Sequence, residues 1–269
     1  MTAHQIVRSA RRPARTSVLR SALIGLLAAL VAAAPLASAQ PQAPLHCGPF
    51  TQDALPQPAA RENVHARERF ERIKAALKSQ PYKVLFLGDS LTERFDQEVW
   101  QAHMAPRGVM NAGINGDRTE HLLWRLTHGN LDGPPPRAIV LLIGTNDLGH
   151  GRPPDLAAEG VRAILVKLRQ RLPDARILLL GLWPRADLPR LQERHEIDAV
   201  NRLIALCDDG AVTYADIGAL LLEPDGRLSP QISPDRLHFS AQGYARLAPR
   251  LDALIDQLLG ADNRPPVPR

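Results

Sequence analysis

The sequence lacks the short motifs by which nucleotide-binding proteins and metalloproteins are recognised. It contains no Gly-x-Gly-x-x-Gly and no P-loop, so it offers no visible cradle for a nucleotide. Its nine histidines are scattered, and no pair has metal-ligand spacing with a supporting carboxylate. We therefore expect no metal site and no cofactor. The Gly-x-Ser-x-Gly elbow of the α/β-hydrolases is also missing, because Leu91-Thr92 follows Ser90.

Most of the chain also lacks an excess of charge of one sign. The formal net charge is +5, but the first 39 residues contain five arginines and no acidic residue. The remaining residues carry 28 basic and 28 acidic side chains and are net neutral. A neutral chain has no overall field that would hold phosphates, so a nucleic-acid partner is not expected.

The first 39 residues have the layout of a secretory signal peptide. Five arginines precede an uncharged apolar run at residues 21–34, and the small residues Ala37-Ser38-Ala39 stand before Gln40. The run is shorter than the roughly 20 apolar residues that a membrane span needs. We therefore predict that residues 1–39 are removed, that the protein is exported to the periplasm or secreted, and that no membrane span remains.

Proline-rich segments flank the part of the chain that is suited to form a core. Residues 40–60 contain five prolines and are predicted to be an extended leader, and residues 261–269 a flexible tail. The folded domain is thus expected over residues 61–260. Cys47 and Cys207 can pair after export, but Cys207 can equally be a buried small apolar residue and Cys47 a stray in the leader. The sequence leaves the disulfide open.

Short apolar runs alternate with amphipathic segments through the predicted domain, in a chain that is 45% apolar and 23% charged. Strands are expected at residues 83–87, 109–111, 138–143, 176–181 and 212–216, with helices between them. The clearest helices are 155–172 and 240–259, the second with a kink or break at Pro249. Strands that alternate with helices predict a three-layer α/β/α sandwich with a parallel, flavodoxin-like sheet of about five strands.

Polar loops follow the first three expected strands directly, at the edge where active sites of such sheets lie. One of them carries Ser90, whose hydroxyl becomes a strong nucleophile only when an oriented base takes its proton. Asp235 and His238 supply a carboxylate and an imidazole at a spacing that lets one turn bring them together. The three residues together predict a serine nucleophile, its base and the group that orients the base.

The same loops offer donors for the negative charge that develops on an attacked carbonyl. We expect an oxyanion hole made by the backbone N–H groups of Ser90 and Gly113 and the side-chain amide of Asn146. Gly113 fits because a side chain there would obstruct the substrate. Asp117 is expected to cap the following helix.

Two tryptophans are assigned different places. Trp183, at the end of the fourth expected strand, is a candidate wall of the acyl or sugar pocket. Trp124 lies on an expected helix and is assigned to the core.

Four segments together resemble the blocks of the SGNH, or GDSL, hydrolases, which are esterases and lipases. They are Gly88-Asp89-Ser90-Leu91, Gly113, Gly144-Thr145-Asn146-Asp147 and Asp235-Arg236-Leu237-His238. The resemblance implies Ser90 as nucleophile, Gly113 and Asn146 as oxyanion donors, and His238 as base paired with Asp235.

A closer likeness covers about residues 84–258. The segments 111–117, 123–126, 181–185 and 238–240 are similar to the catalytic subunits of intracellular platelet-activating-factor acetylhydrolase and their bacterial relatives. That branch favours short acyl groups, acetyl above all. The chain departs from it by its predicted export and by Asp147 where those subunits tend to have Asn, so the phospholipid substrate is not carried over.

The sequence thus predicts an exported serine esterase that hydrolyses short-chain, acetyl-type esters of small molecules or polysaccharides. A lysophospholipase or thioesterase for longer acyl chains is an alternative within enzymes, although no apolar lid is evident. A catalytically silent carbohydrate-binding module on the same scaffold is an alternative from another class. The natural substrate and the oligomeric state are not indicated.

Overall fold

The computed structural model describes residue 47 and residues 56–260. The predicted signal peptide, most of the predicted leader and the predicted tail lie outside the described residues. Among the described helices, none combines the length and the apolar character that crossing a membrane requires.

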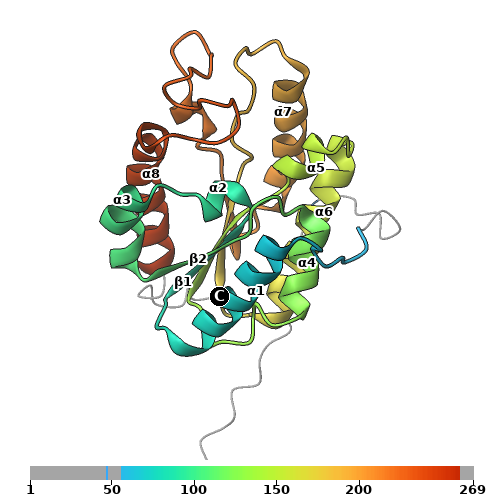
Figure 1. The fold of residues 1–269 in the computed structure, drawn as a ribbon, viewed down its shortest axis with the longest axis vertical. Helices are drawn as coiled ribbons and strands as arrows, with labels where there is room; N and C mark the ends of the chain where they lie inside the picture. The colour runs from blue at the N-terminus through green and yellow to red at the C-terminus, as the bar shows by residue number, and fades with distance from the viewer. Residues whose placement is uncertain (1–46, 48–55, 261–269) are drawn as a thin grey trace, which may run out of the picture. The chain divides into compact units, whose positions relative to one another are not determined.

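A five-stranded parallel sheet forms the centre of the molecule, in the order β2-β1-β3-β4-β5 (Figure 1). Helices α4, α6 and α7 pack side by side on one face, and α3 and α8 pack together on the other. The predicted three-layer α/β/α fold is confirmed. The strands are β1 Val84–Gly88, β2 Val109–Gly113, β3 Ala138–Leu142, β4 Arg176–Leu180 and β5 Val212–Ala215. The α-helices are α1 Val64–Ser79, α2 Ser90–Glu93, α3 Gln97–Val99, α4 Thr119–Thr127, α5 Thr145–Gly149, α6 Pro154–Arg171, α7 Gln192–Ile204 and α8 Ala241–Gly260. Short π and 3₁₀ turns are η2 Trp100–Met104, η3 Ala105–Arg107, η4 Ala205–Cys207 and η5 Gly218–Leu221.

The predicted elements differ from the observed ones mainly at their ends. Helix α8 runs through Pro249 as one helix, so of the kink or break that was expected there the break does not occur. Helix α1 precedes the first strand and was not singled out, although its buried residues Ala66, Phe70, Ile73 and Leu77 follow helical spacing. Asn63 starts it, because its side-chain oxygen accepts from the Ala66 N–H at 2.7 Å.

The central strands explain where the polar loops meet. Every residue of β1 and β3 is buried, since helices cover both faces of the sheet, and both strands read as continuous apolar runs. In the register of the sheet, Gly88 lies opposite Gly113 on one side and Leu142 on the other. The loops that follow these three residues therefore leave the sheet at the same edge.

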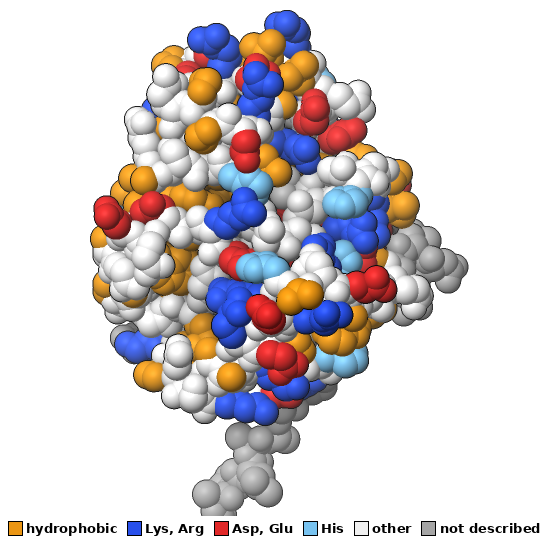
Figure 2. Space-filling view, in the orientation of Figure 1, with side chains coloured by type: hydrophobic (Ala, Val, Ile, Leu, Met, Phe, Trp, Pro, Cys, Tyr) orange, Lys and Arg blue, Asp and Glu red, His pale blue; other side chains and the backbone are white. Residues whose placement is uncertain are grey.

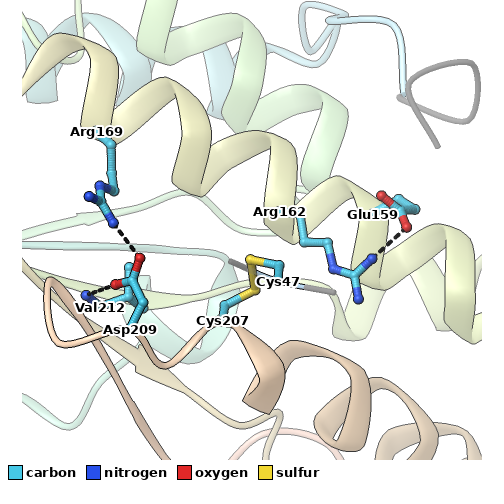
Figure 3. Close-up of a disulfide and its surroundings, with 7 residues drawn as sticks. All are labelled: Cys47, Glu159, Arg162, Arg169, Cys207, Asp209 and Val212. Atoms are coloured by element: carbon cyan, nitrogen blue, oxygen red, sulfur yellow. Dashed lines mark hydrogen bonds and ion pairs between the residues drawn. A yellow bond between two sulfur atoms is a disulfide. The ribbon is translucent and has the colours of Figure 1, made fainter. Parts of the chain in front are cut away.

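The structure answers the question that the sequence left open about the cysteines. Cys47 and Cys207 form a disulfide, and both residues are buried (Figure 3). The bridge lies beside α6, between the Glu159–Arg162 and Arg169–Asp209 ion pairs. It joins residues that are 160 positions apart in the sequence.

Removing the bridge should destabilise the fold. A cross-link that closes so long a loop restricts the unfolded chain, and losing a native disulfide costs about 2–5 kcal/mol. We expect Cys47→Ser and Cys207→Ser each to lower the free energy of unfolding by that amount in urea titrations. Dithiothreitol should lower it equally in the wild type and leave both variants unchanged. A wild type that unfolds identically with and without reductant would contradict this expectation.

Candidate active site

Ser90, His238 and Asp235 form one hydrogen-bonded chain at the carboxyl edge of the sheet. Ser90 is the first residue of α2, and its Oγ lies 3.0 Å from His238 Nε2. His238 Nδ1 lies 2.7 Å from Asp235 Oδ2. A carboxylate on Nδ1 favours the ring tautomer that carries its proton there, which leaves Nε2 to accept the proton of the serine. The three side chains that were predicted to meet do so in the geometry that proton transfer needs.

One carboxylate builds the turn that carries the imidazole. Asp235 Oδ1 accepts from the backbone N–H groups of Leu237 at 3.0 Å and His238 at 2.7 Å, while Oδ2 faces the ring. Partial burial raises the pKa of Asp235, but the bonds from the His238 ring and from the two backbone N–H groups outweigh it and lower that pKa overall. Asp235 is therefore ionised when it faces the ring.

Gly113 is not placed as a free oxyanion donor. Its N–H donates to the side-chain oxygen of Asn111 at 3.1 Å. A Cβ on Gly113 would lie 2.3 Å from the backbone nitrogen of Glu93 and 2.7 Å from the carbonyl oxygen of Asp89. The glycine is needed because β2 packs directly against the segment that carries Ser90. The predicted role of Gly113 is corrected accordingly.

The loop after β2 offers a different donor, Gly116, which sequence reasoning missed. Gly116 has a φ of +76°, which favours glycine, and its carbonyl accepts from Arg61. The carbonyl of Asp117, the next residue, accepts from the Asn146 amide at 2.9 Å. Within residues 56–260 no acceptor is found for the Gly116 N–H. The Asn146 amide thus contacts the residue that follows Gly116, which places these two donors on adjoining segments.

A buried ion pair lies beneath these loops. Asp117 Oδ2 lies 2.7 Å from Arg125 Nε, with side chains 0% and 2% exposed. Arg125 also donates to the carbonyl of Gly88 at 2.9 Å and to Asn130 at 3.0 Å. Burial raises the pKa of Asp117 to about 6 although Arg125 opposes the shift. Asp117 thus holds the loop between β2 and α4 through its ion pair with Arg125 and is not the helix cap that was predicted.

The cap of α4 comes from helix α5. Asp147 accepts from the backbone N–H of Thr119 at 3.0 Å and from its hydroxyl at 2.7 Å. Asp147 also pairs with Arg152. Because Thr119 is the first residue of α4, this buried carboxylate holds the start of α4 against α5, next to Asn146.

Both tryptophans pack against the core, which corrects the prediction for Trp183 and agrees with that for Trp124. Trp183 is 1% exposed and packs against Phe239 and Tyr244, so it belongs to the core and does not wall an open pocket. Trp124 is partly exposed and stacks on His128 with 4.2 Å between ring centroids. It lines a cavity of about 90 Å³ beside the Gly116 loop. Histidines and charged side chains of both signs gather around the middle of the face shown in Figure 2.

Asp89, the neighbour of Ser90, should make stability depend on pH. It is fully buried; Oδ1 accepts from the Leu91 N–H at 2.9 Å, and Oδ2 has no partner in the described part of the chain. Burial first, then the charges of Asp117 and Asp147, raise its pKa to about 7. The folded state thus keeps a proton that the unfolded state releases, so stability falls as pH rises through this window.

We expect Asp89→Asn to flatten that fall. Each pH unit between about 4 and 7 should cost the wild type up to about 1.4 kcal/mol relative to the variant. Urea titrations of both proteins in steps from about pH 5 to pH 8 measure the difference. A difference that stays constant over the whole range would show that Asp89 is ionised throughout.

Comparison with known proteins agrees with this geometry. Residues 86–246 match the GDSL-like lipase/acylhydrolase family. The chain is 35% identical over 209 residues to the platelet-activating factor acetylhydrolase IB subunit alpha2 of Rattus norvegicus, covering 75% of this chain and 90% of that protein. The chain belongs by these matches to a family of known hydrolases.

Solved structures share the fold. A GDSL-like lipase from Bacteroides thetaiotaomicron superposes with a TM-score of 0.59 at 20% identity, over 72% of this chain and 99% of that one. An acetylxylan esterase from Geobacillus stearothermophilus superposes with a TM-score of 0.53 at 19% identity, over 65% and 94%. Together with the family match and the Ser90–His238–Asp235 geometry, these findings identify the protein as a member of the GDSL-like lipase/acylhydrolase family and a carboxylic ester hydrolase.

Proposed function

We propose that the protein is an exported serine esterase that removes short acyl groups, acetyl above all, from small molecules or polysaccharides through an acyl-enzyme on Ser90. The observation that carries the proposal is the 3.0 Å contact between Ser90 Oγ and His238 Nε2, with Asp235 on the far side of the ring. It supplies a nucleophile, a base and an orienting carboxylate in one line.

In the first half of the reaction His238 Nε2 takes the proton of Ser90 as Oγ attacks the ester carbonyl. Asp235 stabilises the imidazolium that forms. The N–H groups of Ser90 and Gly116 and the amide of Asn146 receive the developing oxyanion. The imidazolium then protonates the leaving alcohol, and the acyl group remains on Oγ.

Water completes the reaction by the same route in reverse. His238 accepts a proton from the water as it attacks the acyl-enzyme, and the three donors again stabilise the oxyanion. Collapse of the intermediate releases the carboxylic acid and returns the proton to Ser90.

Three observations support a short acyl group. Ser90 is 2% exposed, so little open space surrounds its hydroxyl. The curated relative is named an acetylhydrolase, and one solved neighbour is named an acetylxylan esterase. Carbohydrate acetate is therefore a reasonable first class of natural substrate to test.

Two observations support export. The first 39 residues have the layout of a signal peptide. The Cys47–Cys207 disulfide is of the kind that persists in oxidising compartments. Cell fractionation, with the N-terminal residue of the mature protein determined, tests this part of the proposal.

A panel of nitrophenyl esters from acetyl to octanoyl tests the acyl preference. We expect kcat/KM to be highest for acetyl or propionyl and to fall by octanoyl. An open apolar groove would give the opposite trend, since each buried methylene adds about 0.8 kcal/mol of binding. A maximum at octanoyl would favour the lysophospholipase or thioesterase alternative. Failure of Ser90 to react with an organophosphorus probe would favour the silent binding module. Acetylated xylan and acetylated peptidoglycan then distinguish the natural alcohols.

A further inference from the structure

The segment after β4 contacts the helix that carries the amide donor. Arg185 Nη1 donates to the carbonyl of Thr145 at 3.2 Å, and Thr145 immediately precedes Asn146. A Cβ on Gly149 would lie 3.1 Å from the same nitrogen. One guanidinium nitrogen therefore contacts α5 where the carbonyl of its first residue, Thr145, points toward its last, Gly149.

The next two residues of that segment contact the turn that carries the base. The Ala186 N–H donates to the carbonyl of Arg236 at 2.9 Å. The Asp187 carboxylate lies 3.5 Å from the Arg236 guanidinium. Arg236 stands between Asp235 and His238, so these contacts hold the middle of the turn.

Ala186 and Arg236, which form this hydrogen bond, both have an unusual backbone conformation. Ala186 has a φ of 65° and Arg236 a φ of 64°, and they are the two non-glycine residues with positive φ in the described part of the chain. They are also hydrogen-bonded to each other. A conformation that side chains disfavour persists only where the surroundings impose it, and such positions concentrate at functional sites.

We propose that residues 185–187, called the strap, are positioning residues that set the placement of Asn146 relative to His238. Arg185 acts through Asn146, and Ala186 acts through the turn of Asp235 and His238. Neither touches the reacting atoms. The inference rests on the proposed esterase function. It adds that the strap connects the segment of Asn146 with the turn of His238.

The strap is well suited to this task because the residues at its start are buried. It follows β4 through Trp183 and Pro184, which are both buried. The carbonyl of Asp187 accepts from the Leu228 N–H at 3.0 Å, which ties its end to the long loop before Asp235. Both ends are thus held, and the two contacts to the site are made between them.

The first test separates positioning from simple packing by a double-mutant cycle with nitrophenyl acetate. A misplaced donor should lower kcat by about 10- to 100-fold in Arg185→Gln with little change in KM, and Arg185→Lys should recover part of the loss. Asn146→Ala should cost about 10²–10³-fold by itself. In the Asn146→Ala background, Arg185→Gln should have almost no further effect, because the group through which it acts is gone. Arg190→Gln, an exposed change on the same loop, should stay within about twofold.

The second test concerns the backbone of Ala186. Ala186→Gly keeps the N–H and adopts positive φ freely, so kcat should stay within about twofold of the wild type. Ala186→Val disfavours positive φ and should lower kcat by about tenfold or more, with a melting temperature measured alongside. Because Val could also unfold the loop, the cycle with Arg185 remains decisive.

Two results would overturn the proposal that the strap positions Asn146. One is an Arg185→Gln variant with wild-type kcat. The other is a loss of kcat on Arg185→Gln that is equally large in the wild-type and Asn146→Ala backgrounds. Failure of the proposed function itself looks different, since then the wild type would not hydrolyse nitrophenyl acetate and Ser90→Ala would change nothing.

Discussion

Replacing Ser90 by alanine should abolish ester hydrolysis while the fold persists. Within the described residues, the Ser90 hydroxyl has one hydrogen-bond partner, His238 Nε2. Its loss removes the nucleophile but creates no space larger than one oxygen atom. Removing the nucleophile of a comparable triad costs about 10⁶-fold in kcat, and the residual rate comes from the oxyanion donors and binding. We therefore expect a loss of at least about 10⁴-fold.

The measurement is nitrophenyl acetate hydrolysis, with the melting temperature and labelling by a fluorophosphonate recorded on the same samples. Ser79→Ala is the matched control, because Ser79 is an exposed serine at the end of α1. It should retain full activity and full labelling. Should purified Ser90→Ala keep more than about a tenth of the wild-type rate, the acyl-enzyme route would have to be abandoned.

Replacing Arg125 by methionine should have the largest effect on stability. The side chain is 2% exposed and binds Asp117, the carbonyl of Gly88 and Asn130. Methionine fills a similar length but leaves a carboxylate and a carbonyl buried without their donor. Breaking a buried pair from one side costs about 3–5 kcal/mol, which is a large part of the 5–15 kcal/mol that a domain has.

Urea unfolding followed by tryptophan fluorescence measures this loss. Arg72→Met is the matched control, because Arg72 pairs with Glu68 on the surface of α1 and both side chains are more than half exposed. It should cost no more than about 0.5 kcal/mol. The loss in Arg125→Met should be smaller at acid pH, because protonation removes the charge of Asp117. Equal losses in the two variants would show that the buried pair contributes nothing beyond a surface pair.

Most of the fold could be predicted from the sequence because its strands and helices produce local patterns of apolar residues. Strands β1 and β3 are buried on both faces and therefore appear as unbroken apolar runs. Ser90, Asn146, Asp235 and His238 were found because each stands just after a strand or at a fixed spacing within one turn.

What the sequence did not show depends on contacts between distant residues. The contact between Arg61 and Gly116 joins residues 55 positions apart, and no spacing rule predicts it. Gly113 was predicted as a donor because the expected strand of residues 109–111 placed it in the following loop, whereas β2 extends to Gly113 and its N–H is bound by Asn111. Asp117 was interpreted as a cap because it precedes a helix, but Arg125, buried in the last turn of that helix, binds its carboxylate.

The separation of Ser90 and His238 along the chain has a consequence for biosynthesis. Ser90 follows the first strand of the sheet, and His238 comes after the last, 148 residues later. A polypeptide that is still being made, or that has been cut between these points, holds a serine without its base. Hydrolytic activity is thus acquired only when nearly the whole sheet has assembled, and an activity assay of this enzyme doubles as a measure of complete folding.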